Sequence, residues 1–203
     1  MNIPIISPAL RALRRLFDWA LSLADKKWAE PALYGLTFAE ASFLPIPVDP
    51  LLMAMGASKP ERAIRYGLLT TLFSVAGGVF GWLIGAFMMD LIGNHIVEMW
   101  GLEQHWSEVE ALYQEHGNLI LFAAALTPLP FIAFTIVGGA VGQSLPTFVA
   151  IALIGRGLRF VTEGVLLRVW GAPIVAWVEK WFDRLAIVFT ILLVVTIYLL
   201  KYR

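Results

Sequence analysis

Of the 203 residues, 59% are hydrophobic and only 15% are charged, a ratio outside the usual range for a soluble domain of this length. The chain has no cysteine, which excludes a disulfide framework, a thiolate metal site and a cysteine nucleophile. Arginines and an aspartate lie within the first thirty residues, where a signal peptide needs an apolar core, so we expect no cleavable signal. The composition therefore predicts an integral membrane protein.

Residues 1–30 form the first predicted segment. Leu10, Leu13, Phe17 and Leu21 share one face of a helix, and basic side chains occupy the other face. This pattern is typical of an amphipathic helix that lies on a membrane surface.

The membrane domain is predicted to span residues 31–172. In chain order, we expect a hairpin at 32–57, a helix at 63–92, an external segment at 94–117, a hairpin at 118–142 and a helix at 146–170. Gly77, Gly81 and Gly85 lie on one face of the first long helix, which could serve an internal helix contact or a homodimer. A linker and a C-terminal transmembrane helix are predicted for residues 173–203.

The distribution of basic residues indicates that the first hairpin returns to the side from which it starts. Up to Arg65 the chain has eight basic residues, in one cluster before the hairpin and one after it, whereas the acidic segment 94–117 has none. Basic residues tend to remain cytoplasmic, so both clusters are expected inside, together with the N-terminus. The acidic segment is then expected outside.

The second half of the domain repeats the first. Two prolines and a glycine with spacings of two and nine residues occur twice, 83 residues apart, as Pro45, Pro47 and Gly56 and as Pro128, Pro130 and Gly139. A hairpin followed by one crossing inverts the second copy relative to the first. We therefore expect an all-α membrane protein built from an inverted repeat of two re-entrant helical hairpins, each followed by a transmembrane helix.

The candidate site consists of ionisable residues in apolar segments. Glu40 and Asp49 flank the first Pro-Ile-Pro, and an ionisable group at membrane depth is a functional candidate unless it lies near the interface and caps a half-helix end. Arg156, Arg159 and Glu163 share one helical stripe. The arginines suit either a phosphate or an internal ion-pair network that fastens the helices.

No pattern indicates chemical catalysis. His95, His105 and His116 are too widely spaced for a usual zinc site, and there is no phosphate-binding glycine loop or serine elbow. We expect no enzyme activity, no metal, no cofactor and no nucleic-acid partner.

The chain resembles the DedA family, also called the VTT domain or SNARE-associated Golgi protein family, and in particular its YqaA-like bacterial branch. The matching segments are Glu40 to Asp49 (EASFLPIPVD), the glycine-rich helix from Gly77 to Gly85, Thr127 to Gly139 (TPLPFIAFTIVGG) and Gly155 to Phe160 (GRGLRF). The family commonly has a basic residue in the second hairpin, where this chain has Ile132 and Ala133.

The resemblance implies a multi-pass protein of the bacterial inner membrane that moves an anionic lipid, such as undecaprenyl phosphate or a phospholipid, as a flippase or scramblase with proton coupling. The expected substrate-binding residues are Arg156, Arg159, Glu40, Asp49, Pro45, Pro47, Thr127, Pro128 and Pro130. The expected proton-coupling residues are Glu40, Asp49 and Glu163. The alternatives are a proton- or cation-coupled carrier of a small solute and a membrane scaffold that transports nothing.

Overall fold

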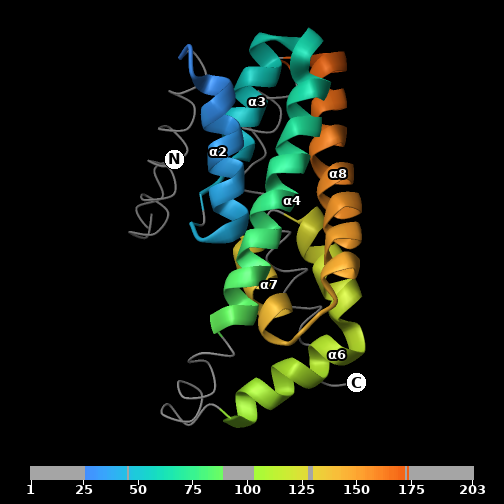
Figure 1. The fold of residues 1–203 in the computed structure, drawn as a ribbon. Coiled ribbons are helices and arrows are strands. Elements are labelled where there is room, and N and C mark those ends of the chain that lie inside the picture. The colour runs from blue at the N-terminus through green and yellow to red at the C-terminus, as the bar shows by residue number, and fades with distance from the viewer. Residues whose placement is uncertain (1–25, 45, 89–102, 128–129, 172, 174–203) are drawn as a thin grey trace, which may run out of the picture.

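The computed structural model describes residues 26–44, 46–88, 103–127, 130–171 and 173. Across these residues the secondary structure is helical, without a strand (Figure 1). The elements are α2 (Ala29–Ser42), α3 (Asp49–Ser58), the 3-10 helix η1 (Pro60–Arg62), α4 (Ala63–Met88), α6 (Glu103–Leu126), α7 (Phe131–Ala140) and α8 (Leu145–Trp170). The predicted all-α class is confirmed. The predicted N-terminal amphipathic helix, the C-terminal transmembrane helix, Pro45 and Pro128 lie outside the described residues.

The helix boundaries repeat along the chain. Helices α3 and α7 have ten residues each and begin at residues 49 and 131, and α4 and α8 have 26 residues each and begin at residues 63 and 145. Both pairs of starting points are 82 residues apart. The spacing of the prolines and glycines in the sequence thus corresponds to a repeat of whole helices.

Prolines and glycines set several of these boundaries. Asp49 and Pro50 begin α3, and α7 begins directly after Pro130, because a proline lacks the N–H that a helix interior needs but fits its first turn. Gly142, with a φ of 71°, forms the turn between α7 and α8, where residues with a Cβ are disfavoured. Helix α6 continues through residues 117 and 118, so the expected change from an external segment to a hairpin falls within one helix and stays a prediction.

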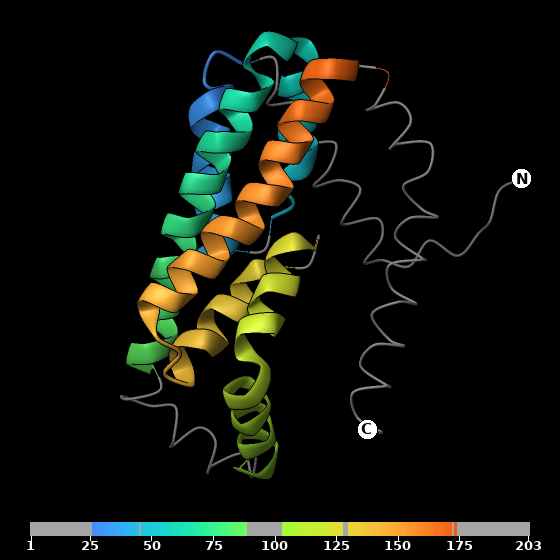
Figure 2. The same ribbon diagram turned by 90° about the vertical axis from the view of Figure 1, so that its right-hand side faces the viewer.

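The short helices form two hairpins that enter the bundle from opposite ends. Helix α2 descends beside α4 and α3 returns toward the same end, whereas α6 rises from the other end and α7 turns back toward it (Figures 1 and 2). At 1.5 Å per residue, α3 and α7 are about 15 Å long and α4 and α8 are about 39 Å long. The first residues of α3 and α7 therefore both lie near the middle of the long helices.

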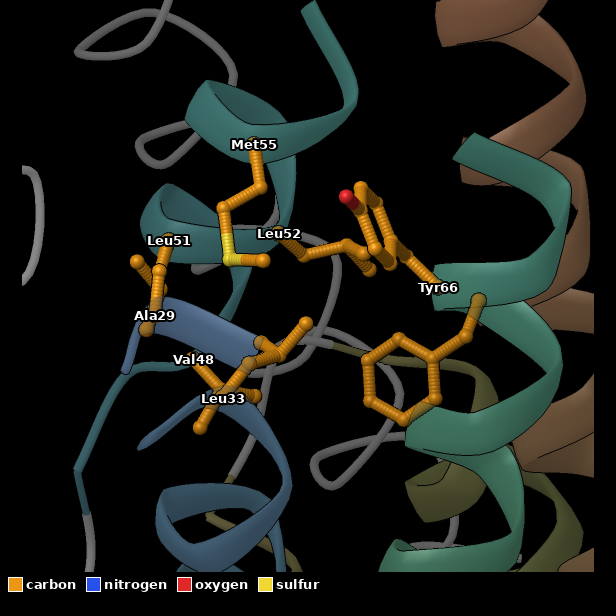
Figure 3. Close-up of a cluster of buried hydrophobic side chains, with 8 residues drawn as sticks. Ala29, Leu33, Val48, Leu51, Leu52, Met55 and Tyr66 are labelled. Atoms are coloured by element: carbon orange, nitrogen blue, oxygen red, sulfur yellow. The ribbon is translucent and has the colours of Figure 1, made fainter. Parts of the chain in front are cut away.

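A hydrophobic core holds the first hairpin against the long helices. Figure 3 shows side chains from α2 and α3 meeting Tyr66 of α4, and Phe160 of α8 completes the cluster, whose other members are Ala29, Leu33, Val48, Leu51, Leu52 and Met55. A second cluster holds the other hairpin and includes Ala41 of α2 together with Phe131 and Phe148. Ala41 thus links the end of α2 to the second half of the repeat.

The glycine face of α4 is used within the chain. A Cβ at Gly77 would collide with the backbone of Phe38 in α2, and a Cβ at Gly85 would collide with the carbonyl of Ile136 in α7. A Cβ at Gly81 would collide with Thr135. These glycines therefore allow α2 and α7 to approach α4 closely. The homodimer stays a prediction.

In the part of the chain that the structure describes, two helices are long and apolar enough to cross a membrane: residues Pro60–Met88, which include α4, and α8. Large apolar side chains are exposed on both helices, for example Leu72 (55% exposed) and Ile154 (57%), whereas Arg156 near the middle of α8 is buried. A large apolar surface around a polar interior suits a lipid environment better than water. The placement of the hairpins as re-entrant segments of a bilayer stays a prediction.

Candidate functional site: two acid and arginine pairs

The first pair joins α2 to α8. One carboxylate oxygen of Glu40, Oε2, lies 3.0 Å from Nη2 of Arg156, and Oε1 lies 3.3 Å from the same nitrogen. The side chains are 9% and 1% exposed, respectively. Because isolated charges are costly to bury, each group depends on the other for its place in the interior.

The second pair joins α3 to the same helix. Nη2 of Arg159 lies 2.5 Å from Oδ2 of Asp49, and the side chains are 14% and 30% exposed. Arg156 and Arg159 are eleven and fourteen residues from the start of α8 at Leu145, about 17 and 21 Å along a helix of about 39 Å. Both pairs therefore lie near the middle of this predicted span.

Each pair also bonds a helix end of the second hairpin. Oε1 of Glu40 accepts a hydrogen bond of 3.0 Å from the backbone N–H of Phe131, the first residue of α7. Arg159 donates to the backbone carbonyl of Thr127, which follows the last residue of α6. An anion at a helix N-terminus and a cation at a C-terminus both match the helix dipole. Glu40 of the first half therefore holds the start of α7, and Arg159, which is paired with Asp49 of the first half, holds the end of α6.

Aromatic rings enclose the arginines. Cζ of Arg156 lies 4.1 Å from the centroid of the Phe131 ring and 5.4 Å from that of Phe160. Cζ of Arg159 lies 5.4 Å from the Phe160 centroid. Cation–π contacts of this kind contribute most where water is excluded.

A third carboxyl group lies beside the second pair. Glu163 is an electrostatic neighbour of Asp49 and Arg159, and its Oε1 is buried with no hydrogen-bond partner among the described residues. Within this part of the chain, Oδ1 of Asp49 and Nε of Arg156 are also buried without a partner. The cluster thus contains three carboxyl groups, two guanidinium groups and unused hydrogen-bonding capacity.

The structure brings together five of the predicted site residues: Glu40, Asp49, Arg156, Arg159 and Glu163. Their roles in binding and proton coupling stay predictions. The remaining candidates supply backbone: Thr127 offers its carbonyl, Pro47 lies in the turn of the first hairpin, and Pro130 precedes α7. Pro45 and Pro128 lie outside the described residues.

Sequence reasoning missed Phe131 and Phe160. Both read as ordinary core residues, yet Phe131 supplies a backbone donor to Glu40 and a ring to Arg156. The available signal was the position of Phe131 directly after Pro130, because the first N–H of a helix lacks an intrahelical partner.

Tyr113 of α6 anchors the outer part of the second hairpin. Its phenol donates a hydrogen bond of 3.1 Å to the carbonyl of Phe134 in α7. Burial raises the pKa of Tyr113 to about 12, so the phenol keeps the proton that it donates.

Comparison with known proteins agrees with this architecture. Residues 46–168 match the VTT domain, a region that contains α3, the second hairpin and both arginines. The chain belongs to the VTT domain family. An uncharacterized protein of Haemophilus influenzae is 30% identical over 186 residues, which cover 92% of this chain and 96% of that protein. An uncharacterized protein of Histophilus somni is 30% identical over 146 residues, covering 72% and 76%. No solved structure gives a significant match.

Membership of the VTT domain family is consistent with a transporter-like role in a membrane. A buried cluster at the meeting point of two broken helical hairpins can present cations, exchangeable carboxyl groups and helix ends to one ligand. The described residues contain no group of three or more histidine, acidic or cysteine side chains placed to hold a metal ion.

Proposed function

We propose that this protein moves an anionic lipid, a phospholipid or undecaprenyl phosphate, across the bacterial inner membrane, with the headgroup passing between the turns of the two hairpins. The observation that carries the proposal is the position of two arginines at the middle of α8, each held by a carboxylate from the first hairpin. A guanidinium group binds two phosphate oxygens at once, so a phosphate can replace a carboxylate at the same nitrogens.

The exchange is driven by protonation. When Glu40 or Asp49 takes up a proton, its arginine loses the counter-charge and binds the lipid phosphate instead. When the carboxyl group releases its proton, the carboxylate returns to the arginine and displaces the phosphate. Charge inside the membrane stays balanced in both states, which avoids the cost of an unpaired ion.

Glu163 provides a further proton-binding group in this scheme. Three carboxyl groups near two guanidinium groups leave one negative charge in excess when all are ionised. Because an unpaired buried anion is costly, one proton is held within the cluster. A proton passed between Glu163 and Asp49 then couples lipid release to proton movement.

The proposed orientation follows from the charges at the two ends of the bundle. Lys59, Arg62, Arg65 and Arg168 gather at one end, and no lysine or arginine occurs between Arg65 and Arg156. This end is cytoplasmic if the positive-inside rule applies, which also places the N-terminus inside. With ten residues, α3 and α7 are about 15 Å long, half of a hydrocarbon core of about 30 Å. Each hairpin is therefore suited to re-enter rather than to cross.

The test is lipid translocation by purified protein in liposomes that contain a fluorescent anionic lipid. We expect Arg159→Gln to reduce the translocation rate to that of empty liposomes. Arg168→Gln is the matched control, since Arg168 is exposed on the same helix and donates to the carbonyl of Glu61 outside the site. Equal rates for wild type, Arg159→Gln and Arg168→Gln would contradict the proposal.

A scaffold without transport is the second candidate, because both arginines already have carboxylate partners that fasten the helices. On this alternative, a folded Asp49→Asn variant loses stability, and wild type and variant both leave translocation at the background rate. The transport proposal instead requires a wild-type rate above background.

A further inference from the structure

A second feature lies on the outer side of the seam between α4 and α8. A groove of about 660 Å³ opens there, within the range of ligand sites, and its walls are Leu68, Leu72 and Leu153, with Thr71 and Gly157 among the other lining residues. Arg65 also lines the groove. Every lining residue except Arg65 and Thr71 is apolar or glycine.

The two helices run antiparallel, which places Arg65 at one end of the groove. Gly67 of α4 packs against Phe160, and Gly78 packs against Phe148, so residues early in α4 face residues late in α8. The stretch of α4 from Arg65 to Leu72 extends about 10 Å along the helix. The groove thus has a cationic end and an apolar body.

Gly157 keeps the groove open. A Cβ at this position would touch only Cγ2 of Thr71, at 3.7 Å, which is an ordinary contact distance. At Gly67 and Gly164, by contrast, a Cβ would collide with the backbone of the facing helix. Those two glycines are used for close packing, whereas the missing side chain of Gly157 leaves room at the surface.

The charge at the end of the groove is not neutralised within the described residues nearby. Arg62 and Arg65 share one carboxylate, Glu30, at 3.4 and 4.0 Å. The Arg65 side chain is 63% exposed, and exposed pairs at such distances are weak. One positive charge is therefore available at this end, close to the start of a predicted membrane span.

We propose that this groove binds an anionic phospholipid, with the phosphate on Arg65 and one acyl chain along the groove. A phospholipid has this arrangement of parts: an anion at the interface and an apolar chain directly below it. The site is separate from the acid and arginine pairs. The proposal concerns equilibrium binding of a lipid, so it can be tested independently of lipid translocation.

The cysteine-free chain allows a direct test. A bimane label at Leu72→Cys, in the wall of the groove, is compared with one at Phe80→Cys, an exposed position on the same helix outside the groove. The labelled protein is placed in nanodiscs that contain phosphatidylglycerol or phosphatidylcholine at equal mole fraction. Each lipid carries a spin label on its acyl chain, and the spin label quenches bimane fluorescence. From the quenching at residue 72, we expect binding of phosphatidylglycerol to be preferred over phosphatidylcholine by roughly fivefold, the value for one basic side chain near an anionic lipid. At residue 80 we expect no preference.

Two further substitutions separate the parts of the site. Arg65→Gln should abolish the preference for phosphatidylglycerol at residue 72. Gly157→Leu should reduce quenching by both lipids, whereas Gly35→Leu, on α2 where a Cβ meets nothing within 4 Å, should leave it unchanged. Equal quenching by the two lipids at residue 72 in the protein that retains Arg65 would overturn the proposal. The proposal would also be overturned if another segment of this chain, or a second copy, shielded the label at residue 72 from both lipids.

Discussion

Replacing Glu40 by glutamine tests how strongly the first pair holds the fold together. Glutamine keeps an oxygen that can accept from the N–H of Phe131, at 3.0 Å in the wild type, but removes the charge opposite Arg156. The Arg156 side chain is only 1% exposed, so water cannot solvate its guanidinium charge once the carboxylate is gone. Removing one partner of a buried ion pair costs about 3–5 kcal/mol, and we expect Glu40→Gln to lose this much stability.

The double variant Glu40→Gln, Arg156→Met distinguishes an ion pair from general packing. Methionine fills part of the arginine stem volume without a charge, so the double variant contains no unpaired ion. Because replacing both members of a buried pair is often nearly neutral, we expect the double variant to be more stable than either single variant, with a coupling of about 3 kcal/mol.

The assay is equilibrium unfolding of the purified proteins in mixed micelles with increasing denaturing detergent. Arg168→Gln serves as the control on the same helix and should change stability by less than about 0.5 kcal/mol, as exposed substitutions usually do. If the effects of the two single substitutions simply add in the double variant, the pair is not coupled and the reasoning is refuted.

Further predictions concern the helix contacts and the third carboxyl group. Gly85→Ala should strongly destabilise the protein in the same assay, because the new Cβ would collide with a backbone carbonyl of α7. Gly35→Ala, by contrast, should be neutral or stabilising by up to about 1 kcal/mol. Equal effects of the two substitutions on stability would exclude close packing as the cause. Tyr113→Phe should cost about 1 kcal/mol, since it removes one buried hydrogen bond, and an unchanged stability would show that this bond contributes nothing net. Glu163→Gln should flatten the pH dependence of lipid translocation, and a profile identical to wild type would remove Glu163 from proton coupling.

Much of the architecture could be predicted from local pattern. The two matched proline and glycine triplets indicated a repeat, and the helix boundaries repeat with nearly the same offset. The continuous helix α6 was not predicted, because the change from polar to apolar residues near position 118 does not interrupt helical backbone. Composition reports the environment of a helix, and backbone hydrogen bonding decides where it ends.

The charged residues of the site could be predicted from the sequence, but which acid pairs with which arginine could not. Helical periodicity placed Arg156 and Arg159 on one stripe. Their assignment to Glu40 and Asp49, respectively, depends on how the turn of the first hairpin meets α8, a tertiary contact across more than a hundred residues. The bond from Phe131 to Glu40 depends on the approach of both hairpins and has no local signal beyond the preceding proline.

The asymmetry of the site also becomes clear from the repeat. With an offset of 82 residues, Arg156 and Arg159 correspond to Ser74 and Gly77, and Asp49 corresponds to Phe131. In the two ion pairs, the first half therefore supplies the acids and the second half supplies the bases. Charge complementarity between the halves, rather than identical sites in each, explains why the second hairpin needs no charge of its own.

In the proposed function, the arginine cluster moves an anionic lipid. The most direct measurement is the initial rate at which wild-type protein transfers fluorescent phosphatidylglycerol between leaflets, compared with phosphatidylcholine in matched vesicles. We predict a rate above that of empty vesicles for the anionic lipid, a slower rate for the zwitterionic one, and slowing as the pH rises and the carboxyl groups stay ionised. Folded protein that moves neither lipid faster than empty vesicles, or both at the same rate at every pH, would contradict the account.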